Sequence, residues 1–175
     1  MMTFRQTEQF TKYMKMVEND KLFTTHDKQY VVHESPEGGN RTIGYGHKLN
    51  LIEQQNQQVM GWDLEDIDEQ VASIILAQDI QDHANNVSQK VPRWDCRSQR
   101  EKEMLVAFDF NLGNVFKVFP KFSFAILTRD MDTQRKEYKR YYRDSMGHRK
   151  ELKRRNRLFY ARYLSPMAVK AWGDD

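Results

Sequence analysis

The sequence predicts an α+β protein in which one helix is followed by a small antiparallel sheet and then by a bundle of helices. Three observations lead to this fold class. An N-terminal segment carries apolar residues at helical spacing, the next stretch is rich in β-formers and glycine, and the remainder alternates apolar stripes with helix caps. The 175 residues are enough to bury one core. We therefore expect a single domain over residues 1–175, in which residues 1–60 form the N-terminal helix and a small β-lobe and residues 61–175 form a helical lobe.

The first helix is predicted over residues 3–18. Four apolar residues have the i, i+3, i+4 and i+7 spacing of one buried helix face: Phe10, Tyr13, Met14 and Val17. Glu18 comes directly after this face, at the predicted end of the helix. A carboxyl group that lies against apolar surface is suited to proton donation. Glu18 is therefore a candidate general acid.

The next stretch, residues 21–47, carries the signals of strands and tight turns. Its "QYVV" is rich in β-formers, its "PEGGN" is typical of a turn, and its "RTIGYG" reads as a returning strand. Glycine allows a backbone to approach an extended ligand closely. On the returning strand, Thr42 offers a hydroxyl group that could hold a water molecule. We expect a small β-lobe that carries part of a binding site.

Two helices are predicted after the sheet. Asp63 is expected to cap the first of them, and its apolar stripe would consist of Ile67, Val71, Ile74 and Ile75. The second begins at Ser98–Glu101, "SQRE", which is a capping box. The apolar sequence that follows indicates a heavily buried central helix, and Gly113 is expected to end it.

The sequence pattern of the last third of the chain predicts three more helices. Pro120 begins a short apolar one. Asp132 is expected to cap "TQRKEYKRYYRD", which Gly147 would end. The final helix is predicted over about residues 149–163, with Leu152, Phe159 and Tyr163 facing inward.

Charge is spread unevenly along the chain. The net charge is +3, but residues 134–163 hold twelve lysines and arginines against three acids, a local net charge of +9, which leaves −6 for the rest. A basic segment of this kind suggests a polyanionic partner, and nucleic acid, anionic lipid and bacterial cell wall all qualify. The alternative is a solvated helix surface.

Several classes of protein do not fit the composition. The histidines have no metal-binding spacing and Cys96 is the single cysteine, so we expect neither a metal nor another cofactor. No apolar run approaches the roughly 20 residues that a membrane-spanning helix needs, so no stable membrane insertion is expected. The N-terminus lacks the apolar core of a signal peptide. A heptad repeat is also absent, which predicts a monomer.

The segment Thr42-Ile43-Gly44-Tyr45-Gly46-His47, ahead of a helical region, resembles the phage-type lysozymes, the muramidases of glycoside hydrolase family 24. In that family a helix ends in Glu-Gly and is followed by Tyr-x-Asp-x-x-Gly-x-x-Thr-Ile-Gly-x-Gly-His. The resemblance implies a lysozyme-like fold, with an active-site cleft between a small N-terminal β-lobe and a larger helical lobe. It also implies that Glu18 is the catalytic glutamate, with Asn19 in place of the glycine.

The resemblance extends over roughly residues 8–164 and suggests further roles. "AQDIQDHA" is similar to the family helix that carries an aspartate near the motif histidine, which implies that Asp79 partners His47. "LVAFDFNLGN" is similar to the family's buried helix, so Asn111 is a candidate wall of the glycan cleft. The implied substrate is bacterial peptidoglycan, cut at its MurNAc-GlcNAc β-1,4 bond, and no nucleic-acid partner is expected.

The sequence departs from the family pattern at the second carboxylate. Pro36 stands six residues before Thr42, where the family has its aspartate, and it cannot ionise. Glu37 is nearest in register and is the favoured second catalytic carboxylate. Glu34 is further off and is the alternative for this role as well as a candidate substrate-binding residue, and Asp20 and Asp27 are more remote candidates. With two carboxylates and Thr42, a water molecule attacks the sugar and the reaction is hydrolysis.

Two other functions stay open. With Glu18 alone, the substrate's own hydroxyl would attack, which is lytic transglycosylase chemistry and yields anhydro-MurNAc ends. A protein that binds the cell wall without cutting it could also use this fold. The absence of a signal peptide suggests a phage product that waits in the host cytoplasm until a holin opens the membrane, or one that is packaged in the virion.

Overall fold

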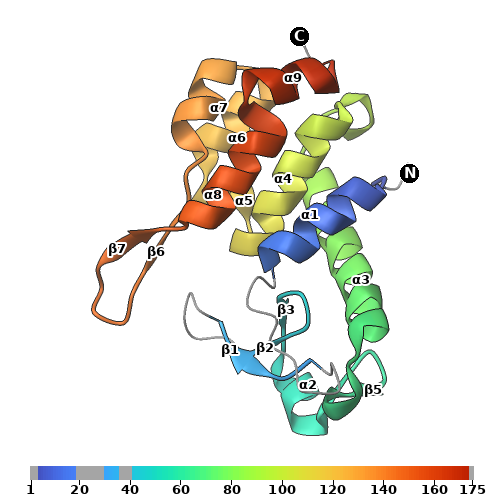
Figure 1. Ribbon diagram of the computed structural model, residues 1–175. Helices are drawn as coiled ribbons and strands as arrows, with labels where there is room; N and C mark the ends of the chain where they lie inside the picture. Colours follow the sequence, from blue (N-terminus) through green and yellow to red (C-terminus); the bar gives the residue numbers. More distant parts are fainter. Residues whose placement is uncertain (1–3, 19–29, 36–40, 174–175) are drawn as a thin grey trace. The chain divides into compact units, whose positions relative to one another are not determined.

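The computed structural model describes residues 4–18, 30–35 and 41–173 (Figure 1). The chain divides into two compact units. The β-unit comprises Gln6–Asp79 and Arg143–His148, and the helical unit comprises Met1–Arg5, Ile80–Tyr142 and Arg149–Asp175. Helices and small antiparallel sheets together confirm the predicted α+β class. The division into lobes at residue 60 within one domain stays a prediction.

Helix α1 (Glu8–Glu18) opens the β-unit, and its buried residues are the four predicted from the spacing. It begins five residues later than expected. The reason is Thr7, whose hydroxyl accepts a hydrogen bond from the amide of Phe10 at 3.1 Å and so caps the first turn. Val17 is only 8% exposed, so the last turn of the helix still lies against apolar surface.

A three-stranded antiparallel sheet follows, in the order β1 (His33–Glu34), β2 (Arg41–Ile43), β3 (His47–Lys48). Of the β-rich "QYVV", Gln29 lies outside the described residues, the amide of Tyr30 donates to the carbonyl of Ile67, and the three-stranded ladder begins at His33. Gly44 and Gly46 have φ of 61° and 81°, which favour glycine in the turn between β2 and β3. The predicted turn over residues 36–40, which includes Glu37, lies outside the described residues.

Three short elements between the sheet and the long helix were not predicted. Helix α2 (Leu51–Asn56) begins with a capping box made by Asn50 and Glu53. A hairpin of β4 (Gln58–Val59) and β5 (Trp62–Asp63) follows, and then a 3₁₀ turn, η1 (Leu64–Asp66).

The long helix α3 (Glu69–Ser88) corrects two predictions. Asp63 makes no side-chain cap, whereas Asp68 Oδ1 accepts from the amide of Val71 at 2.8 Å. Ile74 is 46% exposed, so the predicted stripe is displaced. The buried residues are Ala72, Ile75, Leu76, Ile80, Ala84 and Val87.

The helical unit is built around α4 (Gln99–Leu112), as predicted. The Ser98–Glu101 capping box is present, and Gly113 ends the helix with φ of 81°. Most of the helix is buried. Around it lie η2 (Trp94–Cys96), α5 (Val115–Val118), α6 (Pro120–Leu127), α7 (Met131–Glu137), α8 (Lys153–Phe159), a π-helical turn η3 (Tyr160–Leu164) and α9 (Pro166–Trp172).

Aromatic rings fill the centre of this unit. Phe108 on α4 has its ring centroid 4.4 Å from that of Phe122 on α6 and 4.9 Å from that of Phe159 on α8. Tyr163 continues the cluster at 4.9 Å from Phe159. The predicted inward positions of Phe159 and Tyr163 are therefore confirmed, and both side chains are fully buried.

The region after α6 differs most from the prediction. Asp130, not Asp132, caps α7, since its Oδ1 accepts from the amide of Thr133 at 3.0 Å. The helix ends at Glu137, and a hairpin of β6 (Tyr141–Arg143) and β7 (Arg149–Glu151) replaces the rest of the predicted helix (Figure 1). Gly147 lies in the hairpin turn with φ of 83°. The final predicted helix accordingly begins at 153 rather than 149, and α9 was not predicted.

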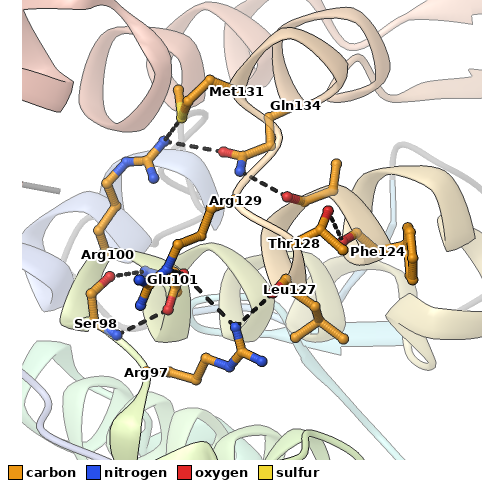
Figure 2. A network of polar contacts seen from close by, with 11 residues as sticks. Arg97, Ser98, Arg100, Glu101, Phe124, Leu127, Thr128, Arg129, Met131 and Gln134 are labelled. Atoms are coloured by element: carbon orange, nitrogen blue, oxygen red, sulfur yellow. Dashed lines mark hydrogen bonds and ion pairs between the residues drawn. The ribbon is translucent and has the colours of Figure 1, made fainter. Parts of the chain in front are cut away.

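Glu101 joins the start of α4 to the end of α6 (Figure 2). Its carboxylate accepts from the amide of Ser98 at 3.0 Å and from Arg129 Nε at 2.9 Å. Arg97 donates to the carbonyl of Leu127 at 2.8 Å in the same network. Because Glu101 is only 3% exposed, these bonds are needed to offset the cost of burying its charge.

Candidate active site

Glu18 is the last residue of α1 and is half-buried. It follows the buried Val17, so the helix delivers a carboxyl group to the edge of the apolar face, as predicted from the spacing. A carboxyl at such an edge can act as a proton donor while solvent or a ligand still reaches it. Its catalytic role stays a prediction.

Thr42 lies in the middle of β2 and is 5% exposed. Its hydroxyl oxygen lies 3.0 Å from His33 Nε2, and it can also donate to the carbonyl of His33 at 3.3 Å. His33 was not singled out from the sequence. The signal is visible only in the strand register, which places His33 opposite Thr42.

Glu34 is exposed and lies opposite Arg41 in the same ladder. Adjacent residues of a strand point to opposite faces, so Glu34 does not share the face of Thr42. This register argues against Glu34 as a carboxylate that acts together with Thr42. Glu37 itself lies outside the described residues.

In the helical unit, Asn111 is half-buried near the end of α4. Arg140 donates from Nη1 to Asn111 Oδ1 at 3.3 Å. The guanidinium of Arg140 also lies over the ring of Phe108, 4.2 Å from its centroid. Arg140 is 1% exposed, which is unusual for an arginine. It was counted in the sequence only as part of the basic segment.

The backbone of Arg140 is held by one side chain. Asn156 on α8 accepts from the amide of Arg140 at 2.9 Å and donates to its carbonyl at 3.0 Å. Both groups of the amide side chain are thereby used, and Asn156 is 1% exposed. The contact fixes the chain just before the β6–β7 hairpin and keeps Arg140 beside Asn111.

The predicted pair of His47 and Asp79 is confirmed, at 2.8 Å from Nδ1 to the carboxylate. A second carboxylate, Glu53 of the α2 capping box, lies 3.2 Å from Nε2. Burial pushes the pKa of His47 down, but the two carboxylates outweigh burial and raise it above its usual value. His47 is therefore a structural link between β3, α2 and α3, and its two carboxylate partners favour the protonated imidazole.

A second cluster, centred on Glu69, holds the Gly-Tyr-Gly turn. Its carboxylate accepts from the hydroxyls of Tyr30 and Tyr45, and from Lys15 at 2.7 Å. Burial opposes ionisation, but the hydrogen bonds from Lys15, the two tyrosines and Ser73 lower the pKa of Glu69 to about 2. The cluster ties α1 and the turn to the start of α3, which steadies the strand that carries Thr42.

Within residues 4–18, 30–35 and 41–173, no group of three His, Cys, Asp or Glu side chains is arranged to hold a metal ion. In the same part of the chain, no helix combines the length and the apolar character needed to cross a membrane.

Comparison with known proteins supports the lysozyme-like reading. In structure, the chain is similar to the muramidase domain of SpmX from Asticaccaulis excentricus, with a TM-score of 0.58 and 19% sequence identity, over 93% of this chain and 99% of that one. At this identity the likeness bears on the fold alone, and it confirms the predicted lysozyme-like fold. No curated protein sequence matches the chain.

The family model for phage lysozyme matches residues 26–157. This range includes the motif from Thr42 to His47, and it also includes Asn111. Glu18 precedes it, so its assignment depends on its place at the end of α1. Since the match covers well over half of the 175 residues, the chain belongs to the phage lysozyme family.

Proposed function

We propose that the protein is a muramidase that hydrolyses the β-1,4 bond between MurNAc and GlcNAc in bacterial peptidoglycan. The single observation that carries this proposal is the family match over the motif Thr42–His47. The position of Thr42 on β2, and of His47 on β3 with its contact to Asp79, supports the proposal.

Glu18 is the proposed general acid. It would give its proton to the glycosidic oxygen as the bond to the sugar breaks. Its place at the end of α1, directly after the buried Val17, supports this role, because the helix holds the carboxyl group at a fixed position.

Glu37 is the proposed second carboxylate, and Thr42 assists it. Together they would guide and deprotonate the water that attacks the anomeric carbon, with Asn111 contacting the glycan. The strand register supports the choice of Glu37, since Glu34 lies on the other face from Thr42.

Two alternatives are distinguished by their products. A lytic transglycosylase would use Glu18 but no water, and would leave anhydro-MurNAc ends. A protein that only binds the wall would leave the glycan intact, with the basic segment over residues 134–163 holding the polyanion. The family match supports an enzyme acting on the glycan over pure binding.

The proposed setting is bacteriophage infection. The enzyme would act as an endolysin that reaches the wall when a holin opens the membrane, or as a virion lysozyme that cuts the wall during entry. The proposal includes a monomeric enzyme that needs no metal or other cofactor.

The test is the release of soluble glycan from purified peptidoglycan by the wild type, Glu18→Gln and Glu8→Gln. Glu8 is the matched control, because it lies on the same helix, is exposed and pairs with Lys12 at 2.7 Å. We expect Glu18→Gln to lose activity by at least about a hundredfold and Glu8→Gln to match the wild type. Equal activity of all three proteins would refute the assignment of Glu18 as the general acid. An inactive wild type would refute the proposal that the protein is a muramidase.

A further inference from the structure

His33 and Thr42 face each other across the β1–β2 ladder. They are Cα partners in antiparallel strands, so their side chains emerge on the same face. Thr42 Oγ1 lies 3.0 Å from His33 Nε2. The hydroxyl proposed to hold the attacking water is therefore already in contact with an imidazole.

The neighbours of the imidazole decide which atom donates. His33 Nδ1 lies 3.0 Å from the carbonyl oxygen of Val31, which can only accept, so Nδ1 carries the hydrogen. In the neutral imidazole Nε2 is then an acceptor, and the hydroxyl of Thr42 donates to it. The other acceptor near the Thr42 hydroxyl, the carbonyl of His33, is further away, at 3.3 Å, so the imidazole is the nearer acceptor.

The consequence concerns the lone pairs of Thr42. A hydroxyl has one hydrogen and two acceptor positions. With its hydrogen directed at His33, Oγ1 presents only acceptor positions to any other group that reaches it. Thr42 is 5% exposed, and rotation would exchange the 3.0 Å contact with His33 Nε2 for the longer one, 3.3 Å, with the carbonyl of His33. The hydroxyl is therefore directed at His33 before substrate arrives.

We propose that His33 is a positioning residue for the hydrolytic water, acting through Thr42; this rests on the proposed muramidase function. The water donates one hydrogen bond to Thr42 Oγ1 and turns its own lone pair towards the anomeric carbon. A bond forms from the water oxygen to that carbon while the glycosidic bond breaks. The leaving oxygen takes the proton of Glu18, and the proton of the water goes to the second carboxylate.

The sequence gives a reason for this arrangement. Pro36 stands where the family has its aspartate, and it cannot accept a hydrogen bond with a side chain. The placement of the water therefore depends more heavily on the hydroxyl of Thr42, and a fixed hydroxyl orders the water at a lower entropic cost than a rotating one.

The experiment measures kcat and KM on soluble peptidoglycan fragments for five proteins besides the wild type. These are His33→Phe, His33→Gln, Thr42→Val, the double variant His33→Phe/Thr42→Val, and the control His148→Phe. His148 is an exposed histidine of the hairpin turn, so its replacement leaves the rate unchanged. Thermal unfolding of each variant reports the effect on the fold separately.

We expect His33→Phe to lower kcat about tenfold to hundredfold while KM stays within about twofold. Thr42→Val lowers kcat similarly, and the double variant is no slower than Thr42→Val, since the two residues act as one unit. His33→Gln keeps most of the rate, because its carbonyl can still accept from Thr42.

Three results would overturn the proposal: a His33→Phe rate equal to that of the wild type, losses that multiply in the double variant, or a His33→Gln rate as low as that of His33→Phe. If activity requires Glu18 but not His33, only this inference fails. If the wild type releases nothing, the proposed function fails with it.

Discussion

His47 Nδ1 lies 2.8 Å from Asp79 Oδ2, so the last residue of the Thr42–His47 motif is tied to the middle of α3. Glu53 lies on the other side of the ring, 3.2 Å from Nε2, and its own side chain also caps α2. One imidazole therefore links a strand, a short helix and a long helix. The side chain of His47 is 13% exposed, so the link is largely shielded from solvent.

This link should make stability depend on pH. The pKa of His47 is raised by its carboxylates above the usual value of about 6.5, so its contribution is fully present below about pH 6.5 and is lost as the pH rises through the raised value. We predict that His47→Gln lowers the free energy of unfolding by about 1–2 kcal/mol near pH 5 and by clearly less near pH 9.

Urea unfolding of both proteins at the two pH values checks this prediction. His148→Gln is the control, because that side chain is 62% exposed and its ion pair with Asp144 is long, at 3.5 Å. A cost for His47→Gln that grows from pH 5 to pH 9 would show that the imidazole is held neutral instead.

Glu103 should be the most sensitive charge in the helical unit. It is fully buried, and accepts from Arg162 Nη2 at 2.9 Å and from the hydroxyl of Tyr163 at 2.8 Å. Removing the carboxylate leaves the guanidinium of Arg162 in a partly buried site without that counter-charge. We predict that Glu103→Ala costs about 3–5 kcal/mol and Tyr163→Phe only about 1 kcal/mol.

Chemical denaturation at neutral pH measures both costs. If Glu103→Ala proved no more costly than Tyr163→Phe, the ion pair would be a solvent-screened contact. The cost of Tyr163→Phe gives the free energy of unfolding that is lost when a single neutral hydrogen-bond partner of Glu103 is removed.

The capping box at Ser98 should stabilise α4 locally. Its hydroxyl accepts from the amide of Glu101 at 3.1 Å, and the carboxylate of Glu101 returns to the amide of Ser98. We predict that Ser98→Ala lowers the free energy of unfolding by about 1 kcal/mol, whereas Ser98→Asp, which keeps an acceptor, costs less. Thermal melts of the two variants would show equal losses if the cap were unimportant.

Glu37 and Glu34 form a matched pair for the catalytic prediction. Glu34 lies opposite Arg41, on the face away from Thr42. We predict that Glu37→Gln lowers kcat on peptidoglycan fragments at least about a hundredfold and Glu34→Gln less than about tenfold. The reverse order would move the second carboxylate to Glu34, and two silent substitutions would favour chemistry without an attacking water.

The sequence predicts those elements whose signals are local. The apolar spacing of α1, the capping box at Ser98 and the stop at Gly113 all depend on residues within a few positions of one another, and all are confirmed. Where two local signals compete, the outcome could not be predicted. Asp130 and Asp132 are both possible caps for α7, and the contact of Asp130 with Thr133 decides between them.

The β6–β7 hairpin was missed for a related reason. "EYKRYYRD" has helical spacing of its tyrosines, but its tertiary contacts override that propensity. Asn156 holds both backbone groups of Arg140 and so prevents the helix from continuing past it. Such a contact joins residues 16 positions apart and has no signature in either segment alone.

The residues of the candidate site also differ in whether the sequence alone marks them. Glu18 and Thr42 stand out in the sequence, because a helix end and a short motif mark them, whereas Asn111 was singled out through the family resemblance. His33 and Arg140 do not, since their significance comes from a strand partner and from a buried ring. The partnership of His47 with Asp79 was available only through the family resemblance, and the structure confirms it.

The most direct measurement is the chemical nature of the glycan ends that the protein creates. Purified peptidoglycan is digested with the wild type and with Glu18→Gln, reduced with borohydride and read by mass spectrometry. Hydrolysis by Glu18 and a water molecule predicts reducible MurNAc ends from the wild type and none from Glu18→Gln. Anhydro-MurNAc ends from the wild type, or reducible ends in equal amount from both proteins, would contradict it.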